Sequence, residues 1–267
     1  MNNHNKQLTK FLSAAFVTLI YIFLYLPIAI IVFFSFNSSK LNVVFQGFTL
    51  QWYGVMFQNG DLMSALKNTA IVAVSSVVIS VFIGTLAAIG MFRYEFKGKG
   101  IVDSFLYIPI VIPEIVMGIS LLAFYHILDI NLGLTTLILA HVTFSMPYVV
   151  VTVRSRLSGY DMSLEEAAMD LGATRLHTLL RITLPIIAPG ILAGAMLALT
   201  LSLDDVIVSF FTTGVDSVTL PIYIFNKVKT GVSPDINALI TVIILVTLLV
   251  MLFIRTLEAR APKKGQA

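Results

Sequence analysis

RSRLSGYDMSLEEAAMDLGATRLHTLLRITLP, residues 154–185, is a charged stretch inside a mostly apolar chain. Connections of this length are usually functional or disordered, and this one carries helix signals. Ser163 and Glu166 have the spacing of a capping box, in which each side chain bonds the backbone N–H of the other residue, and Gly172 predicts a left-handed helix end. The stretch therefore predicts a short amphipathic helix, with an apolar stripe made of Leu164, Ala167, Ala168 and Leu171.

A second helix is predicted over residues 174–183, with Pro185 ending it. A short amphipathic helix either lies on a membrane surface or fills a groove on a partner protein. The polar face of the first helix holds Glu165, Glu166 and Asp170. Because an acidic face is poorly suited to anionic lipid, the sequence favours a protein partner.

The rest of the chain has the composition of a membrane protein. Of its 267 residues 58% are hydrophobic and 12% are charged, with a mean hydropathy of +0.95, whereas soluble domains hold about 25% charged residues. A bilayer core of about 30 Å needs about 20 apolar residues in a helix, and backbone groups in lipid must bond within the segment. We therefore expect an all-α membrane protein with six transmembrane helices, over residues 11–36, 66–92, 101–127, 134–153, 186–209 and 236–254.

Local signals refine these runs. The first run, which follows Lys6 and Lys10, is too long for a signal peptide and is predicted to be retained. Pro109 and Pro113 in the third run, and Pro147 in the fourth, predict kinks or local breaks. The chain has no cysteine, so neither a disulfide framework nor a thiolate metal site is expected.

Lysine and arginine set the predicted orientation, because cytoplasmic segments are enriched in them. With the N-terminus inside and six crossings, thirteen of the 17 basic residues fall on the cytoplasmic side. The four on the outer side are Lys40, Lys67, Lys227 and Lys229. The predicted organisation is a cytoplasmic tail over residues 1–10, a transmembrane domain over 11–254 that includes the 154–185 loop, and a cytoplasmic tail over 255–267.

The loop also holds a spaced set of residues: Glu166, Ala167, Ala168, Gly172, Ile182, Leu184 and Pro185. In this spacing it resembles the EAA loop of membrane subunits of binding-protein-dependent ABC importers. The resemblance implies a type I ABC importer permease fold, with a coupling helix that docks into a cleft of a cytoplasmic ATPase. Gly172 would then permit close approach and a sharp bend, and Ala167 and Ala168 would keep the helix thin. With Ser163 these residues form the predicted ATPase-coupling set, although Glu166 and Gly172 also have purely structural roles as cap and helix end.

Three acidic residues lie within or close to predicted spans: Glu114, Asp204 and Asp205. A charge near the bilayer centre costs about 2.5–3.5 kcal/mol or more, so such residues usually face a cavity or a partner. At a rise of about 1.5 Å per residue, Glu114 is predicted about 20 Å along its run from Ile101. Asp204 is predicted about 27 Å along the fifth run from Ile186. Both runs start at the cytoplasmic side, so the acids are expected toward the outside, where a negative cluster suits a cationic substrate.

Other roles stay open for these acids. Glu114 follows Pro113 and would also serve as the cap of a helix that restarts after a break. Asp204 and Asp205 would also mark the outer end of the fifth span, or pair with a basic residue of a second permease subunit. Since neighbouring helical residues face about 100° apart, both aspartates are not expected to point the same way.

Aromatic residues accompany the acids: Tyr107, Phe124, Tyr125, Phe144 and Tyr148. Ammonium groups bind aromatic faces with about 0.5–2 kcal/mol, although packing is the commoner role of an aromatic ring. Tyr107 and Tyr148 join the three acids as predicted substrate-path residues, whereas His126 and His141 are interpreted as packed or surface residues. No catalytic triad, metal-ligand spacing or phosphate-binding glycine loop is present, so the sequence predicts no enzyme, no metal site and no cofactor.

Further stretches point to one branch of the importer permeases: LYLPIAIIVFFSFNSS (24–39), HVTFSMPYVVVTVRSRLSGYD (141–161), LSLDDVIVSFFTTG (201–214) and KVKTGVSPDINAL (227–239). Over nearly its whole length the chain resembles the PotC-type permeases of spermidine/putrescine importers. The resemblance implies a bacterial inner-membrane complex with a PotB-like permease, two PotA-like ATPases and an external PotD-like binding protein, and no nucleic acid. Polyamines are cations, in agreement with the acidic residues.

Rival functions make different demands on the sequence. Related branches carry ferric ion, thiamine, sulfate or molybdate, so the substrate stays open. Import of an anion would call for basic groups along the path, where the spans hold acids instead. A stand-alone secondary carrier usually shows internal repeats, and a membrane enzyme needs a catalytic constellation; neither is visible in the sequence.

Overall fold

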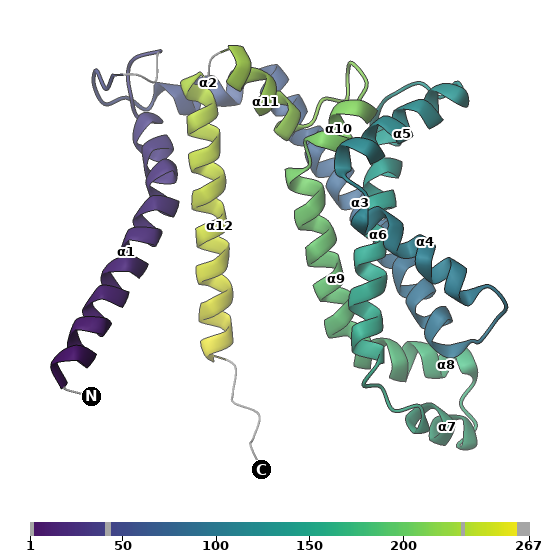
Figure 1. Cartoon of the computed structure of the whole chain (residues 1–267). Coiled ribbons are helices and arrows are strands. Elements are labelled where there is room, and N and C mark those ends of the chain that lie inside the picture. Colours follow the sequence, from purple (N-terminus) through teal and green to yellow (C-terminus); the bar gives the residue numbers. More distant parts are fainter. Residues whose placement is uncertain (1–2, 41–43, 231–232, 261–267) are drawn as a thin grey trace. The chain divides into compact units, whose positions relative to one another are not determined.

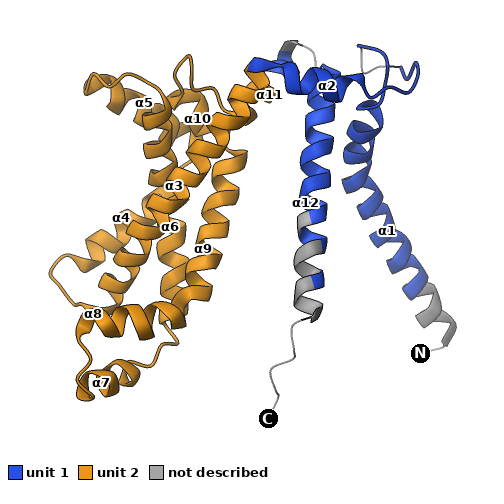
Figure 2. Ribbon diagram, turned by 180° about the vertical axis from the view of Figure 1, so that it is seen from behind, with its two compact units in different colours: residues 1–60, 226–267 blue, residues 61–225 orange. Residues whose placement is uncertain are grey.

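The computed structural model describes residues 3–40, 44–230 and 233–260, and its elements there are helices apart from one isolated bridge between Asn37 and Phe48 (Figure 1). The predicted all-α class is confirmed. The chain divides into two compact units, residues 1–60 with 226–267 and residues 61–225, which are coloured separately in Figure 2.

The first unit consists mainly of α1 (Asn3–Phe34), α2 (Gln51–Gln58) and α12 (Pro234–Arg260). Both α1 and α2 pack against α12. The loop between α1 and α2 is fixed by the indole of Trp52, which donates to the Asn37 carbonyl at 2.6 Å. No side chain in the most apolar window of α1 is buried within this chain, as expected for a helix that faces lipid or another subunit.

The second unit holds both candidate sites. Its elements are α3 (Gly60–Arg93), α4 (Lys99–Val111), α5 (Glu114–Ile127), α6 (Leu134–Leu157), α7 (Ser163–Asp170), α8 (Arg175–Thr178), a π-helical turn (Leu179–Thr183), α9 (Leu184–Asp204), α10 (Ile207–Thr212) and most of α11 (Leu220–Thr230). Helices α6 and α9 run along each other (Figure 1). Their shared core includes Val149, Val153, Ile187 and Ala198, with Ala88 of α3.

The number of crossings is not settled by helix length. Four helical stretches in the described chain are long and apolar enough to span a bilayer: Lys10–Phe34, Gly60–Arg93, Leu134–Leu157 and Arg175–Asp204. Helices α4 and α5 make a fifth if they count as one span bent by 111°. The described apolar part of α12, Pro234–Leu249, is shorter than the others. The count of six therefore stays a prediction.

Two predicted spans are broken. In the third run, Ile112 and Pro113 are extended and separate α4 from α5, which confirms the predicted break at Pro113. Pro109 and Pro147 instead lie inside α4 and α6. The fifth run does not continue to residue 209, because α9 ends at Asp204 and the extended Asp205 precedes α10.

The predicted end of the second loop helix at Pro185 is wrong. Thr174 caps α8 by accepting the His177 N–H at 3.3 Å, and the helical path then continues through the π-helical turn into α9. The N–H of Leu184 bonds the Leu179 carbonyl, five residues back. Pro185 lies in the first turn of α9, where a missing N–H costs little. The loop helices are therefore joined directly to α9.

Candidate functional site

The start of α7 differs from the prediction. Ser163 is the first helical residue and not the cap, and the Glu166 N–H bonds the Met162 carbonyl at 3.3 Å. Asp161 caps instead, because Met162 already has helical dihedrals and the Asp161 carboxylate accepts the Ser163 N–H at 3.0 Å. The predicted capping box of Ser163 and Glu166 is therefore wrong. The hydrogen bonds from Ser163 hold the pKa of Asp161 below its usual range.

The end of α7 is as predicted. Gly172 has a φ of +91°, and its N–H bonds the Met169 carbonyl at 2.9 Å. The Ala173 N–H reaches back to the Ala168 carbonyl at 3.0 Å, which completes a Schellman motif. A Cβ at position 172 would meet no atom of the described residues within 4 Å. Within the chain, the constraint on Gly172 is thus its dihedral angle.

The apolar stripe of α7 points away from the described chain. Leu164 is 47% exposed and Leu171 is 90% exposed, and Ala167 is exposed between them. Next to the stripe is an open groove of about 510 Å³, lined by Ala168, Leu171, Gly172, Ala173, Thr174, His177, Arg181 and Ile182. Of the predicted acidic face, Glu166 and Asp170 are exposed but Glu165 is buried. An uncovered apolar stripe at the helix surface is suited to a protein partner.

Glu165 fastens α7 to the rest of its unit. Its Oε1 accepts a hydrogen bond from Arg93 Nη2 at 2.5 Å and another from Thr183 Oγ1 at 2.6 Å. Arg93 Nη2 also donates to Thr183 Oγ1 at 3.0 Å. Burial acts to raise the pKa of Glu165, but the hydrogen bonds from Thr183 and Arg93, with the Arg93 charge, bring it below its usual range. The Glu165 carboxylate therefore joins α7 to the end of α3 and to the π-helical turn that precedes α9.

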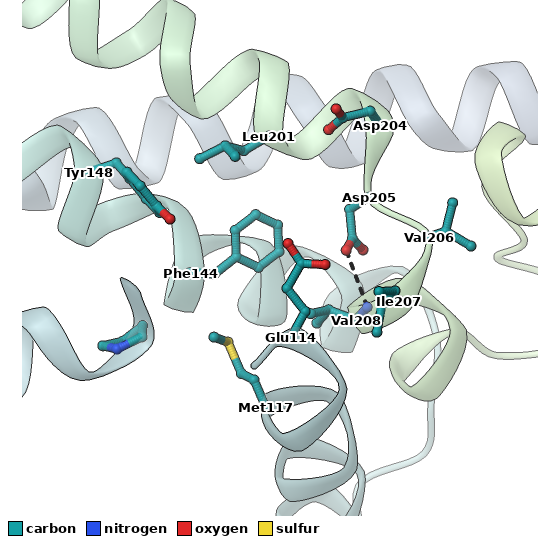
Figure 3. Close-up of a pocket in the computed structure, with 11 residues that line it drawn as sticks. Glu114, Met117, Phe144, Tyr148, Leu201, Asp204, Asp205, Val206, Ile207 and Val208 are labelled. Atoms are coloured by element: carbon teal, nitrogen blue, oxygen red, sulfur yellow. Dashed lines mark hydrogen bonds between the residues drawn. The ribbon is translucent and has the colours of Figure 1, made fainter. Parts of the chain in front are cut away.

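The acidic residues meet at a cavity of about 310 Å³ in the second unit (Figure 3). Its lining residues are Pro109, Glu114, Met117, Phe144, Tyr148, Leu201, Asp204, Asp205, Val206, Ile207 and Val208. Four of the five predicted substrate-path residues are thus brought together. Tyr107 is not among them; it lies on α4 and is 43% exposed.

The three acids differ in their contacts. Asp205 is buried and caps α10, accepting the N–H of Val208 at 3.2 Å and of Ser209 at 2.7 Å. Glu114 is the first residue of α5, where the positive helix end favours a carboxylate. Within the described chain, neither Glu114 nor Asp204 has a side-chain hydrogen bond or ion pair. Two exposed carboxylates therefore remain available at the cavity.

Close packing of α5 on α10 holds this cavity together. A Cβ at Gly118 would lie 2.6 Å from Cδ2 of Phe211. We expect Gly118→Ala to displace α5 from α10 and to destabilise the protein by about 1–3 kcal/mol, as overpacking does. The thermal midpoint of the purified protein measures this. Gly90→Ala is the matched control, because a Cβ at Gly90 meets nothing within 4 Å; equal midpoints for the two variants would contradict the packing role.

Several contact residues were missed in the sequence. Arg93 and Thr183 bind Glu165 from distant parts of the chain. His141, interpreted as a packed or surface residue, is indeed buried, but both of its ring nitrogens are hydrogen bonded to serines. An isolated histidine or arginine gives no local signal, because its partners are set by the tertiary fold. Among the described residues no cluster of three metal-ligating side chains occurs.

Comparison with known proteins agrees with this geometry. The chain is 45% identical over 256 residues to the spermidine/putrescine transport system permease protein PotC of Escherichia coli, covering 96% of this chain and 97% of that protein. It is 44% identical to PotC of Haemophilus influenzae over 238 residues, 89% of this chain and 93% of that one. It is 41% identical to the putrescine transport system permease protein PotI of Escherichia coli over 249 residues, 91% of this chain and 89% of that one.

Solved structures show the same fold. The crystal structure of a bacterial ABC transporter involved in the import of the acidic polysaccharide alginate matches 98% of this chain and 99% of its own, with a TM-score of 0.75 and 13% identity. The alginate transporter in complex with a periplasmic protein bound to alginate pentasaccharide matches 97% of each chain, with a TM-score of 0.70 and 20% identity. Residues 80–263 match the family model for inner membrane components of binding-protein-dependent transport systems. The chain therefore belongs to the family of binding-protein-dependent transport system inner membrane components, which are transport permeases and not enzymes.

Proposed function

We propose that this chain is the permease subunit through which an ATP-driven importer carries polyamines, spermidine or putrescine, across the bacterial inner membrane. The observation that supports this most directly is the cavity with two carboxylates, Glu114 and Asp204, that have no partner within the described chain and lie beside the rings of Phe144 and Tyr148. Carboxylates and aromatic faces are the groups that bind ammonium ions. The relatives are named as a spermidine/putrescine permease, PotC, and a putrescine permease, PotI.

The charge of the cavity tells more about the substrate than the fold does. The structurally similar bacterial ABC transporter is involved in the import of an acidic polysaccharide, so the fold alone does not fix the sign of the substrate charge. Specificity then depends on the groups along the path. An acidic, aromatic-lined cavity favours a cation and disfavours sulfate, molybdate or another oxyanion.

The proposed assembly contains a PotB-like permease, two PotA-like ATPases and a PotD-like binding protein. In the proposed mechanism of alternating access, ATP binding draws the coupling helices together and opens the outer gate. Both termini, residues 1–10 and 255–267, are cytoplasmic in this proposal, with residues 11–254 as the permease domain. The exposed apolar stripe of α7 supports docking of an ATPase at the α7 residues of the coupling set. The full coupling set is Ser163, Glu166, Ala167, Ala168, Gly172, Leu184 and Pro185. Leu184 has a second role, because it packs against the α6–α9 core.

Substrate class is tested by uptake in cells that lack their own polyamine importers and express the complete system. We expect saturable uptake of labelled putrescine or spermidine, with unlabelled polyamines competing and thiamine, ferric ion and sulfate not competing. Uptake of thiamine, ferric ion or an oxyanion in place of polyamines would assign the chain to another branch of the family. Transport by the purified chain alone in vesicles would support a stand-alone carrier.

Gly172 tests the docking of α7. Gly172→Val is expected to abolish uptake and substrate-stimulated ATP hydrolysis while the chain still inserts in the membrane, because a β-branched residue is strained at a φ of +91°. Gly172→Asn separates two causes, since asparagine tolerates this backbone region. Loss of function in the asparagine variant indicates close approach by a partner, and retention indicates that only the bend matters. Gly159→Val, an exposed glycine of the same loop with nothing within 4 Å of its Cβ, is the control; normal uptake by Gly172→Val would rule out docking.

A further inference from the structure

A buried set of hydrogen bonds lies behind the acidic cavity. His141 on α6 is 1% exposed. Its Nδ1 is 2.7 Å from the hydroxyl of Ser202 on α9, and its Nε2 is 2.9 Å from the hydroxyl of Ser209 on α10. These two serines flank the break at Asp205. A single imidazole ring therefore holds both sides of the break.

The proton positions in the His141 hydrogen bonds follow from its partners. The Ser209 hydroxyl donates its only proton to Asp205 Oδ2 at 2.6 Å, so it accepts from His141, whose Nε2 must carry a hydrogen. A neutral ring then accepts the Ser202 hydroxyl at Nδ1. Ser202 in turn lies 3.3 Å from the hydroxyl of Ser76 on α3. The series links α3, α9, α6 and α10 and ends on the Asp205 carboxylate.

This arrangement fixes Asp205 in place. Its carboxylate accepts the Ser209 hydroxyl in addition to two backbone N–H groups of α10. Loss of these donors would leave a buried carboxylate unsatisfied, which is costly. The His141 ring also contacts Phe144, with ring centroids 5.0 Å apart, and Phe144 lines the cavity (Figure 3). The hydrogen-bonded series is thus in contact with the cavity wall at two points.

We propose that His141 is a positioning residue of the acidic cavity. By joining Ser202 and Ser209 it fixes the break between α9 and α10, keeps Asp205 on α10, and holds Asp204 where it and Glu114 receive the ammonium groups of the substrate. The inference rests on the proposed polyamine function and adds a residue to it that makes no contact with the substrate. If His141 has a purely structural role, its loss changes only the stability of the protein. If it positions the acidic residues, its loss also weakens cation binding at the cavity.

The chain contains no cysteine, so Leu201→Cys places one reactive thiol on the cavity wall. The test uses the complete importer with cysteine-free partner subunits and measures how putrescine slows alkylation of this thiol. His141→Gln retains one donor and one acceptor, and His141→Leu retains neither. We expect the half-protecting putrescine concentration to rise about fivefold in His141→Leu, the loss expected for about 1 kcal/mol of hydrogen bonding. It should stay near the parent value in His141→Gln and in the control His126→Leu, an exposed histidine on α5.

Hydrogen exchange of the Val208 and Ser209 amides reports the break without any substrate, because Asp205 accepts both N–H groups. Faster exchange in His141→Leu, together with weaker protection, supports the proposal. Unchanged exchange overturns it, and so does faster exchange with unchanged protection. If putrescine and spermidine protect the thiol in no variant, the proposed polyamine function fails, and exchange alone then decides whether His141 holds the break.

Discussion

The double variant Glu114→Gln, Asp204→Asn is expected to import putrescine about 100-fold more slowly than the parent. A hydrogen bond to a charged group contributes about 1.5–3 kcal/mol, and about 1.4 kcal/mol corresponds to a factor of ten. Each single variant should therefore lose about tenfold. Both substitutions keep side-chain size, and neither carboxylate has a partner in the described chain, so the protein should still fold. The measurement is the initial rate of labelled putrescine uptake, normalised to the amount of assembled complex.

Two further variants separate the cavity from general effects of charge. Asp129→Asn removes an exposed carboxylate from the loop after α5, outside the cavity, and asparagine tolerates its φ of 54°. This control should transport normally. Asp205→Asn weakens the cap of α10, so we expect less assembled complex in addition to slower uptake. Parent-like uptake by the double variant would show that the cavity is not on the cation path.

The sequence predicted the features that depend on local composition. Hydropathy gave the helical membrane class, and Gly172 gave the left-handed end of α7, because only glycine adopts this conformation without cost. Pro113 gave the break between α4 and α5. The cost of charge in apolar runs predicted Glu114, Asp204 and Asp205 toward the outer end of the path, and all three line one cavity. The two aspartates were not expected to point the same way, but both line this cavity, because α9 ends at Asp204 and Asp205 is extended.

Features that depend on competition between neighbouring residues were not predictable. Asp161 and Ser163 are both good caps, and the backbone at Met162 decides for Asp161. Asp205 ends α9 without proline or glycine, because its carboxylate bonds the first N–H groups of α10. Pro185 was taken as a helix end, but it is tolerated in the first turn that follows a π-helical turn.

Features that depend on distant partners were also not predictable. Glu165 and Glu166 both fall on the predicted polar face of α7, and the sequence predicts a special role only for Glu166. Their roles differ because Arg93, 72 residues earlier, pairs with Glu165 and, among the described contacts, not with Glu166. The hydrogen bonds of His141 join residues 61 and 68 positions apart, and no spacing rule connects them.

Replacing Glu165 by leucine is expected to destabilise the protein by about 3 kcal/mol and to uncouple ATP hydrolysis from uptake. The side chains of Arg93 and Glu165 are 18% and 7% exposed, and removing one partner of such a buried pair costs about 3–5 kcal/mol. The lower end applies, because Arg93 keeps some contact with solvent. Its guanidinium would retain only Thr183 as a hydrogen-bond partner among the contacts described here.

Conservative changes separate charge from hydrogen bonding. Glu165→Gln keeps an acceptor for Arg93 and Thr183 but removes the charge, so we expect an intermediate loss. Glu95→Gln is the matched control, since it breaks an exposed i, i+4 pair with Lys99 in which the Glu95 side chain is 87% exposed. Exposed pairs contribute about 0.2–1 kcal/mol. Thermal midpoints and ATPase rates of the assembled complex, with and without loaded binding protein, measure both effects.

The ratio of uptake to ATP hydrolysis then shows whether α7 transmits movement through this contact. If Glu165 joins α7 to α3 and α9, its loss lets the ATPase move α7 without moving α9, which ends at the acidic cavity. Hydrolysis should then persist while uptake falls by about tenfold or more, a coupling loss of at least about 1.4 kcal/mol. A proportional fall of both activities would mean that Glu165 serves folding alone. In that case, movement must reach α9 through the continuous helical path from Arg175 to Asp204, which bypasses the carboxylate.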